Sequence, residues 1–342
     1  MDPAQFLTES RVVIVAGKGG VGKTTVTAAL ARTAAAAGLT TLVVEVEGKS
    51  GLATLYGQPP FAYDEVVLSP GGPGGAADVI ARTLTPDEAL LEYLSDHGLN
   101  RISRRLVSSG ALDVVATAVP GIRDILVLGK VKSLSREPRL DLVLLDAPAA
   151  GHAITFLGSA RGLVDAVKVG PINTQAQEVM DLLRDPELCR VLLVTLPEET
   201  PVNELVETAF NLEDQVGVNL GPVIVNGVYP ELVGLDADPI DAARAAGAAL
   251  RPGEAQHLAD AAAFRRERTE LQTEQVRRLA DQLPLPQIAL PFLFSADLGP
   301  PDLSVLSDAM RAGIEALPAP TPRPARSDGP ASGEAAAEEA VG

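Results

Sequence analysis

A short stretch near the start of the chain has the residue types and spacing needed to hold a phosphate group. Gly17, Gly22, Lys23 and Thr24 follow the spacing Gly-x-x-x-x-Gly-Lys-Thr, which is known as a P-loop. Glycines let the backbone curl closely around an anion, so that successive N–H groups point at it. We expect Lys23 to reach the β- and γ-phosphates of a nucleotide, and the Thr24 hydroxyl to bind Mg²⁺. The other predicted members of this phosphate cradle are Gly19, Gly20, Val21 and Thr25.

A carboxylate and an amide farther along the chain have chemistry that matches this site. Asp146 follows the apolar run 140–145, and a carboxylate at the end of such a strand is expected to hold Mg²⁺ through water. Asn226 follows the run 222–225, and its amide donates and accepts hydrogen bonds at once, which suits the N6/N7 edge of adenine. The simpler alternative for Asn226 is the end of a strand, because Asn-Gly is a common turn pair. The sequence therefore predicts an ATP site with Thr24 and Asp146 at the metal.

These residues must be positioned by a fold in which strands alternate with helices. Apolar runs predict strands at 12–16, 41–46, 65–68, 140–145, 191–195, 222–226 and 288–290. Helical patterns between them predict helices at 28–37, 152–166, 174–184, 200–210, 253–282 and 301–316. Such alternation is typical of an α/β fold with a doubly wound, mainly parallel sheet flanked by helices, as in P-loop NTPases.

Two segments stand apart from this alternation. Residues 77–135 are predicted to be helical, with helices beginning at the capping box Thr85–Glu88 and at Pro120-Gly121. Together with residues 153–187 they form a predicted helical subdomain within one domain of residues 1–317. Pro, Ala, Ser, Gly and Glu fill the tail 318–342, which is predicted to be disordered because it has few residues able to form a core.

The composition excludes several classes of partner and location. The 342 residues carry a net charge of −17, which argues against binding to nucleic acid or to anionic lipid. The N-terminus has no basic and apolar signal segment, and no apolar run approaches the roughly 20 residues that span a bilayer. We therefore expect a soluble, cytoplasmic protein. Its one cysteine, Cys189, lies at the start of an apolar run and is expected to be a buried, inert thiol.

A second lysine in the loop indicates which class of P-loop this is. Lys18 follows Gly17 directly and gives Gly-Lys-Gly-Gly-Val-Gly-Lys-Thr-Thr. This resembles the deviant P-loop of dimeric ATPases such as MinD, ParA, the nitrogenase iron protein, the arsenite-pump ATPase and the ATPase that targets tail-anchored proteins. The resemblance implies that Lys18 acts in catalysis by reaching the nucleotide of a facing subunit, in a homodimer or in a heterodimer with a paralogous ATPase. The simpler alternative is a solvated loop lysine.

Three further marks resemble the arsenite-pump and tail-anchored-protein branch, the ArsA-like family. Asp146 is followed by Gly151-His152 at the spacing of that family's switch II, although alanines replace its two threonines. Pro120-Gly121-Ile122 resembles the start of a family helix. Pro291 and Phe292 resemble its adenine-side loop and are therefore implied to contact the nucleotide. The resemblance covers residues 10–317, which correspond to a single half of the fused arsenite-pump ATPase.

The first nucleotide-sensing loop departs more from the family pattern. The family has Asp-Pro-Ala-His after its second strand, and its aspartate positions the attacking water. Glu47 occupies that place here and is implied to be catalytic, with a side chain one methylene longer. Because phosphoryl transfer depends on close positioning, hydrolysis is expected to be slow or to depend on a partner. The simpler alternative for Glu47 is an exposed glutamate at a strand end.

The resemblance implies a Mg²⁺-dependent ATPase that acts as a nucleotide-gated dimeric switch and binds and releases a hydrophobic protein or a membrane-associated client. One alternative is the energising subunit of anion or metalloid export, and another is a positioning ATPase of the MinD or ParA kind. The chain has three methionines and lacks the Cys-x-x-Cys of the targeting ATPases, so we expect no zinc. The sequence does not identify the client.

Overall fold

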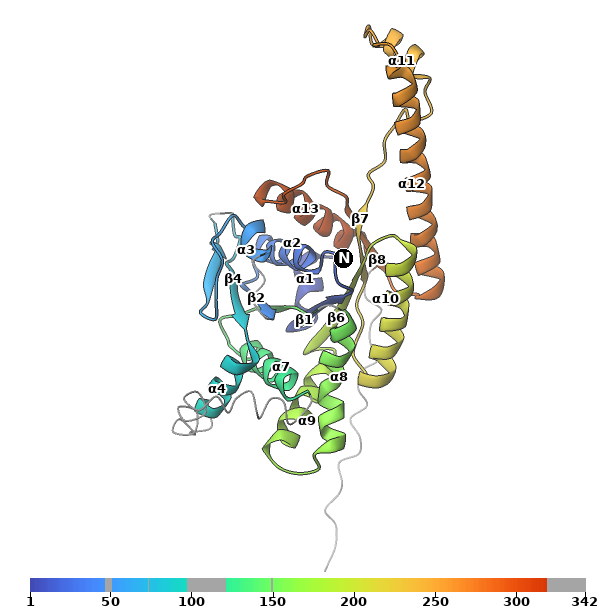
Figure 1. Ribbon diagram of the computed structural model, residues 1–342. Coiled ribbons are helices and arrows are strands. Elements are labelled where there is room, and N and C mark those ends of the chain that lie inside the picture. Colours follow the sequence, from blue (N-terminus) through green and yellow to red (C-terminus); the bar gives the residue numbers. More distant parts are fainter. Residues whose placement is uncertain (47–50, 73, 97–120, 149, 319–342) are drawn as a thin grey trace, which may run out of the picture.

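An eight-stranded sheet forms the centre of the protein, in the strand order β3-β4-β2-β5-β1-β6-β7-β8 (Figure 1). The structure, a computed structural model, describes residues 1–46, 51–72, 74–96, 121–148 and 150–318. All neighbouring strands are parallel except β3 and β4, so the predicted doubly wound, mainly parallel sheet is confirmed. The strands are β1 (Val12–Gly17), β2 (Thr41–Val46), β3 (Val66–Ser69), β4 (Val79–Leu84), β5 (Leu142–Asp146), β6 (Cys189–Thr195), β7 (Val223–Val228) and β8 (Gln287–Pro291).

Helices cover both faces of this sheet, because its central strands are apolar on both sides. In β5, Leu144 packs into the core on one face and Leu145 into the core on the other. The first core also contains residues of α1 (Pro3–Thr8), α2 (Lys23–Ala36), α3 (Gly51–Leu55) and α13 (Pro300–Ala316). The second contains residues of α7 (Ile122–Ser135), α8 (Ala150–Ala166), α9 (Pro171–Arg184), α10 (Glu199–Asn211) and the π-helical turn Leu212–Val216. The alternation of strands and helices thus produces three layers.

The prediction that residues 77–135 are helical is wrong for residues 79–84. Val79–Leu84 is the strand β4, which pairs in parallel with β2 and antiparallel with β3. Pairing with β2 buries Val79, Ala81 and Leu84, and this tertiary contact decides the conformation of a segment too short for a clear periodicity. The helix α4 (Pro86–Asp96) does follow the predicted capping box, since Glu88 N–H donates to Thr85 Oγ1 at 3.3 Å. Residues 97–120 of the segment predicted to be helical lie outside the described residues.

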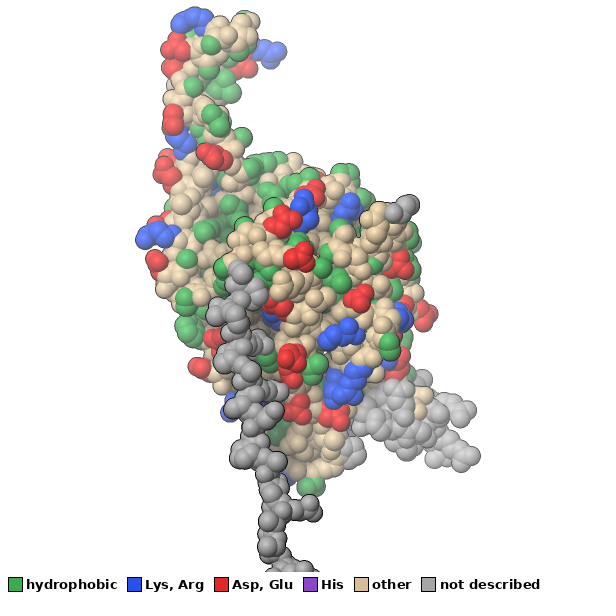
Figure 2. All heavy atoms as spheres, turned by 180° about the vertical axis from the view of Figure 1, so that it is seen from behind, with side chains coloured by type: hydrophobic (Ala, Val, Ile, Leu, Met, Phe, Trp, Pro, Cys, Tyr) green, Lys and Arg blue, Asp and Glu red, His purple; other side chains and the backbone are tan. Residues whose placement is uncertain are grey.

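A long helical extension leaves the body between β7 and β8, and we call residues 229–282 the arm. It contains α11 (Pro239–Ala245) and α12 (Glu254–Gln282), and Figure 1 shows its outer end projecting well beyond the sheet. Figure 2 shows acidic, basic and apolar side chains mixed on the surface of the arm. Its exposed apolar side chains include Leu258, Phe264 and Leu271. The predicted helix 253–282 is confirmed, whereas α11 was not predicted. Among the described residues, none of the helices is long and apolar enough to cross a bilayer.

The single cysteine lies in the core, as predicted. Cys189 is fully buried at the start of β6, next to Val12 in the register of β1 and β6. Burial raises the pKa of its thiol to about 12, because the thiolate loses its hydration. Since the thiolate is the reactive form, this cysteine is inert in the folded protein.

Candidate functional site

The P-loop connects the end of β1 to the start of α2 at the carboxyl edge of the sheet. Gly20 and Gly22 have φ values of +86° and +88°, a backbone region that other residues rarely adopt. A Cβ at Gly22 would in addition collide with Asn226 Nδ2. Lys23 begins α2 and is buried, and its Nζ donates a hydrogen bond of 2.9 Å to the Lys18 carbonyl. Its ammonium group therefore lies over the loop that the sequence predicts to hold phosphate.

The two predicted metal residues lie side by side. Thr24 Oγ1 donates a hydrogen bond of 2.6 Å to Asp146 Oδ2, although 122 residues separate them in the sequence. Asp146 is the last residue of β5, in register with Val15 of β1, so the sheet itself places its buried carboxylate beside the first turn of α2. A hydroxyl and a carboxylate are oxygen ligands of the kind Mg²⁺ accepts, and Mg²⁺ sites commonly use one or two such groups plus substrate phosphates.

A second carboxylate, which sequence reasoning missed, lies beside Asp146. Glu45 of β2 is in register with Asp146 on the neighbouring strand and is only 2% exposed. Residues paired in a parallel sheet point to the same face, so the two carboxylates share one edge of the site. A glutamate inside the otherwise apolar run 41–46 was the available signal, because charged residues are rarely fully buried without a function or a partner.

The candidate adenine residues lie on the other side of the P-loop. Asn226 Nδ2 donates a hydrogen bond of 2.9 Å to the Val21 carbonyl, which joins β7 to the phosphate cradle. Pro291 ends β8, and the Phe292 N–H donates to the Val228 carbonyl at 2.8 Å. The Phe292 ring packs edge-on against Tyr229, with ring centroids 5.2 Å apart. The structure therefore brings Asn226 and Phe292 to adjoining parts of one edge.

The remaining predicted residues fall into three groups. Gly19 is exposed at the tip of the loop, while Thr25 is half-buried in the first turn of α2. Lys18 is also exposed, and its ammonium group forms an ion pair with Glu204 of α10 rather than turning into its own P-loop. Glu47 lies outside the described residues. The structure thus brings Asp146 and Asn226 into contact with the P-loop, whereas the Lys18 side chain lies at the surface.

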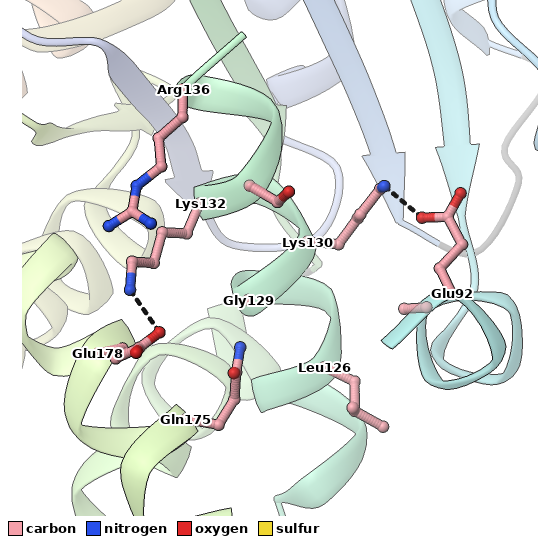
Figure 3. Close-up of a pocket in the computed structure, with 10 residues that line it drawn as sticks. Glu92, Leu126, Gly129, Lys130, Lys132, Arg136, Gln175 and Glu178 are labelled. Carbon is pink, nitrogen blue, oxygen red and sulfur yellow. Dashed lines mark hydrogen bonds and ion pairs between the residues drawn. The ribbon is translucent and has the colours of Figure 1, made fainter. Parts of the chain in front are cut away.

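A separate hollow of about 220 Å³ lies between α4, α7 and α9, and none of the predicted site residues lines it (Figure 3). Lys132 Nζ of α7 forms an ion pair of 2.6 Å with Glu178 Oε2 of α9. Lys130, also on α7, forms an ion pair with Glu92 of α4. One helix is therefore tied to two others across the hollow, and the charges there serve to join the helices.

Several known proteins are similar to this chain in sequence. The model of a family described as "Anion-transporting ATPase" matches residues 10–174, which include the P-loop and Asp146. The ATPase BagA of Mycobacterium tuberculosis is 36% identical over 247 residues, 70% of this chain and 70% of that protein. A putative arsenical pump-driving ATPase of Halobacterium salinarum is 29% identical over 248 residues, 67% of this chain and 37% of that protein. An arsenical pump-driving ATPase of Escherichia coli is 29% identical over 222 residues, 64% of this chain and 35% of that protein.

Proposed function

The chain belongs to the ArsA family of anion-transporting ATPases, and from this premise we propose that it is a Mg²⁺-dependent switch whose ATP cycle opens and closes a dimer. Membership of the family makes the chain a nucleotide-binding ATP hydrolase. The observation that carries the metal dependence is the contact between Thr24 Oγ1 and Asp146 Oδ2 under the P-loop. When bound, Mg²⁺ would supply charge neutralisation at the β- and γ-phosphates.

The chain's own residues have distinct roles in this proposal. Thr24 would bind the metal directly and Asp146 through water, while Lys23 would neutralise phosphate charge from the other side. Glu45 adds a second buried carboxylate beside Asp146, and two neighbouring carboxylates are stabilised by a nearby cation. Glu47 remains the proposed residue that orients the attacking water.

Nucleotide recognition and dimer formation complete the proposed cycle. Asn226 is fixed to the P-loop carbonyl of Val21 through its Nδ2, which leaves its Oδ1 to accept from the adenine amino group. Lys18 is exposed on the loop, where a facing subunit would meet it. An ion pair between exposed groups, such as that of Lys18 with Glu204, contributes little to stability and is readily exchanged for another partner.

The metal ligands can be tested through the Mg²⁺ dependence of ATP hydrolysis. Replacing Asp146 with asparagine keeps the shape but removes the charge that orients the metal's water shell. We expect Asp146→Asn to raise the Mg²⁺ concentration for half-maximal turnover by roughly ten- to a hundred-fold, the scale for groups that hold a metal's ligands. The exposed Asp165→Asn on α8 is the matched control and should behave as wild type. An unchanged Mg²⁺ titration for Asp146→Asn would contradict the assignment.

The proposed output of the switch is binding and release of a hydrophobic protein or membrane-associated client by the helices beyond the sheet. The helix α8 begins four residues after Asp146 and packs on α7 and α9, while α4 packs on α7. Loss of the γ-phosphate is sensed by the loop after Asp146, and such loops change order when the phosphate leaves. Motion there would therefore reach α4 and α7 through packed helices.

Hydrogen exchange in the ATP- and ADP-bound states tests this output without a known client. We expect backbone amides of α4 and α7 to exchange at different rates in the two states, because α7 packs on α8 and α4 packs on α7. The helix α13, on the opposite face of the sheet, is the internal control and should exchange alike. If exchange changes only in the nucleotide loops, the helices take no part in the cycle.

The names of the arsenical pump-driving relatives favour a second candidate, an ATPase that energises anion export. Stimulation of ATP hydrolysis by arsenite or a related oxyanion would support that candidate. The one cysteine is buried with a raised pKa, so a thiol-bound effector would have no accessible ligand in this chain. We therefore place the client-binding switch first.

A further inference from the structure

The strand that carries Asn226 is irregular at this residue. The pairing of β7 with β8 shifts register between Val225 and Val228, and Gly227 within this bulge has a φ of +74°. A bulge redirects a side chain and interrupts the ladder of backbone hydrogen bonds. The backbone directly after Asn226 therefore leaves the regular strand, and its peptide groups need other partners.

A single side chain of the arm supplies these partners. Gln272 Oε1 accepts a hydrogen bond of 2.8 Å from Tyr229 N–H, and its Nε2 donates one of 3.1 Å to the Gly227 carbonyl. Gln272 lies in the middle of α12 and is only 6% exposed. Its amide thus contacts one acceptor within the bulge, the Gly227 carbonyl, and one donor directly after β7, the Tyr229 N–H. A side-chain amide has one donor group and one acceptor group in the same plane, as these two contacts require.

A second residue on the same face of α12 strengthens this attachment. Arg265 lies seven residues before Gln272, two turns along the helix, and its Nη2 donates to the Pro230 carbonyl at 2.7 Å. Its guanidinium group packs over the Tyr229 ring, 4.0 Å from the centroid, and that ring contacts Phe292. The backbone from Gly227 to Pro230 is therefore held against α12 at three polar contacts and one aromatic contact.

We propose that Gln272 is a positioning residue for base recognition, which sets the bulged backbone of β7 so that Asn226 presents its amide to adenine. This inference rests on the proposed role of Asn226. Gln272 does not contact the nucleotide in this scheme but acts through the peptide groups on either side of Val228. Nucleotide affinity then depends on how the arm helix α12 is seated against the end of β7.

The test compares ligands that differ only in the base. Affinities for ATP, GTP and inorganic tripolyphosphate are measured by calorimetry for wild type, Gln272→Ala and Gln272→Glu. We expect Gln272→Ala to weaken ATP roughly ten-fold, the scale of losing buried hydrogen bonds, and to leave GTP and tripolyphosphate within about two-fold. Gln272→Glu keeps the acceptor for Tyr229 N–H but cannot donate to Gly227, so it should also lower the preference for ATP over GTP. Gln275→Ala, one turn away on α12, is the matched control.

Epistasis with Asn226 separates a positioning role from a general structural one. Because Gln272 acts through Asn226, Gln272→Ala should cause no further loss of ATP preference in an Asn226→Ala background. Equal weakening of all three ligands by both Gln272 variants would overturn the inference. If Asn226→Ala abolishes the preference while both Gln272 variants keep it, Gln272 has no positioning role and the base contact stands. If Asn226→Ala itself leaves the preference unchanged, the adenine assignment fails and the inference with it.

Discussion

Replacing Lys23 with alanine is expected to lower ATP turnover by roughly a hundred- to a thousand-fold, the scale of removing one preorganised group that stabilises developing charge. Lys23 is buried at the start of α2, and its ammonium group lies across the loop on the Lys18 carbonyl. In a site shielded from water, a fixed cation interacts more strongly with phosphate charge than it would in solution. No other described side chain of the P-loop can replace it, since Lys18 is directed towards α10.

Binding and turnover should both be measured for this variant. We expect calorimetry to show weaker binding of ATP for Lys23→Ala, because the lost cation contacts the phosphates before as well as during the reaction. Lys132→Ala on α7 removes a largely buried lysine that is paired with Glu178 away from the P-loop, and should leave ATP affinity unchanged. A melting temperature close to that of wild type would show that the P-loop variant is folded. Equal ATP affinity of wild type and Lys23→Ala would disprove the P-loop assignment.

The parts of the fold that were predictable are those where local pattern and tertiary environment agree. The strands β1, β2, β5 and β6 are predominantly apolar and buried along almost their whole length, as expected for parallel strands covered on both faces. The strand β4 was missed because Val79–Leu84 contains Arg82 and Thr83, both of which are buried by neighbours that the sequence does not reveal. Arg82 forms ion pairs with Glu65, directly before β3, and with Glu92 of α4. The polar residues of this strand therefore misled the prediction, because polar residues are usually exposed.

The residues of the candidate site also differ in whether the sequence alone could predict them. The P-loop was predictable because its chemistry lies within nine consecutive residues, and Asp146 because it ends an apolar strand. Glu45 needed the register of β2 against β5, which places it beside Asp146. Gln272 needed the packing of α12 on a bulge, and an amide in a charge-rich helix carries no signal of its own. Contacts that depend on the register of neighbouring strands or on helix packing, such as those of Glu45 and Gln272, were thus the ones that sequence reasoning could not reach.

Lys18→Ala is expected to separate binding from catalysis. The Lys18 side chain is 46% exposed and lies against Glu204, so its loss should leave ATP affinity within about three-fold, the range of a weak exposed ion pair. In the proposed dimer it approaches the nucleotide of the facing subunit, as a cation supplied from outside the site. Turnover should then fall roughly a thousand-fold, the scale for such cations in phosphoryl transfer. Steady-state hydrolysis and calorimetry on the same preparation provide both numbers.

Mixing two inactive variants decides whether Lys18 acts on its own nucleotide or on a neighbour's. A Lys18→Ala subunit keeps an intact Lys23, and a Lys23→Ala subunit keeps an intact Lys18. If Lys18 acts across an interface, mixed dimers contain one complete site, so the mixture should hydrolyse ATP although neither variant does so alone. Light scattering with a non-hydrolysable ATP analogue should show the dimer in wild type. A mixture as inactive as its components, in a protein that does form nucleotide-dependent dimers, would place Lys18 in its own site. If no such dimer forms, co-purification should be used to find a separate partner subunit, and the mixing experiment repeated with that subunit carrying the matching substitution.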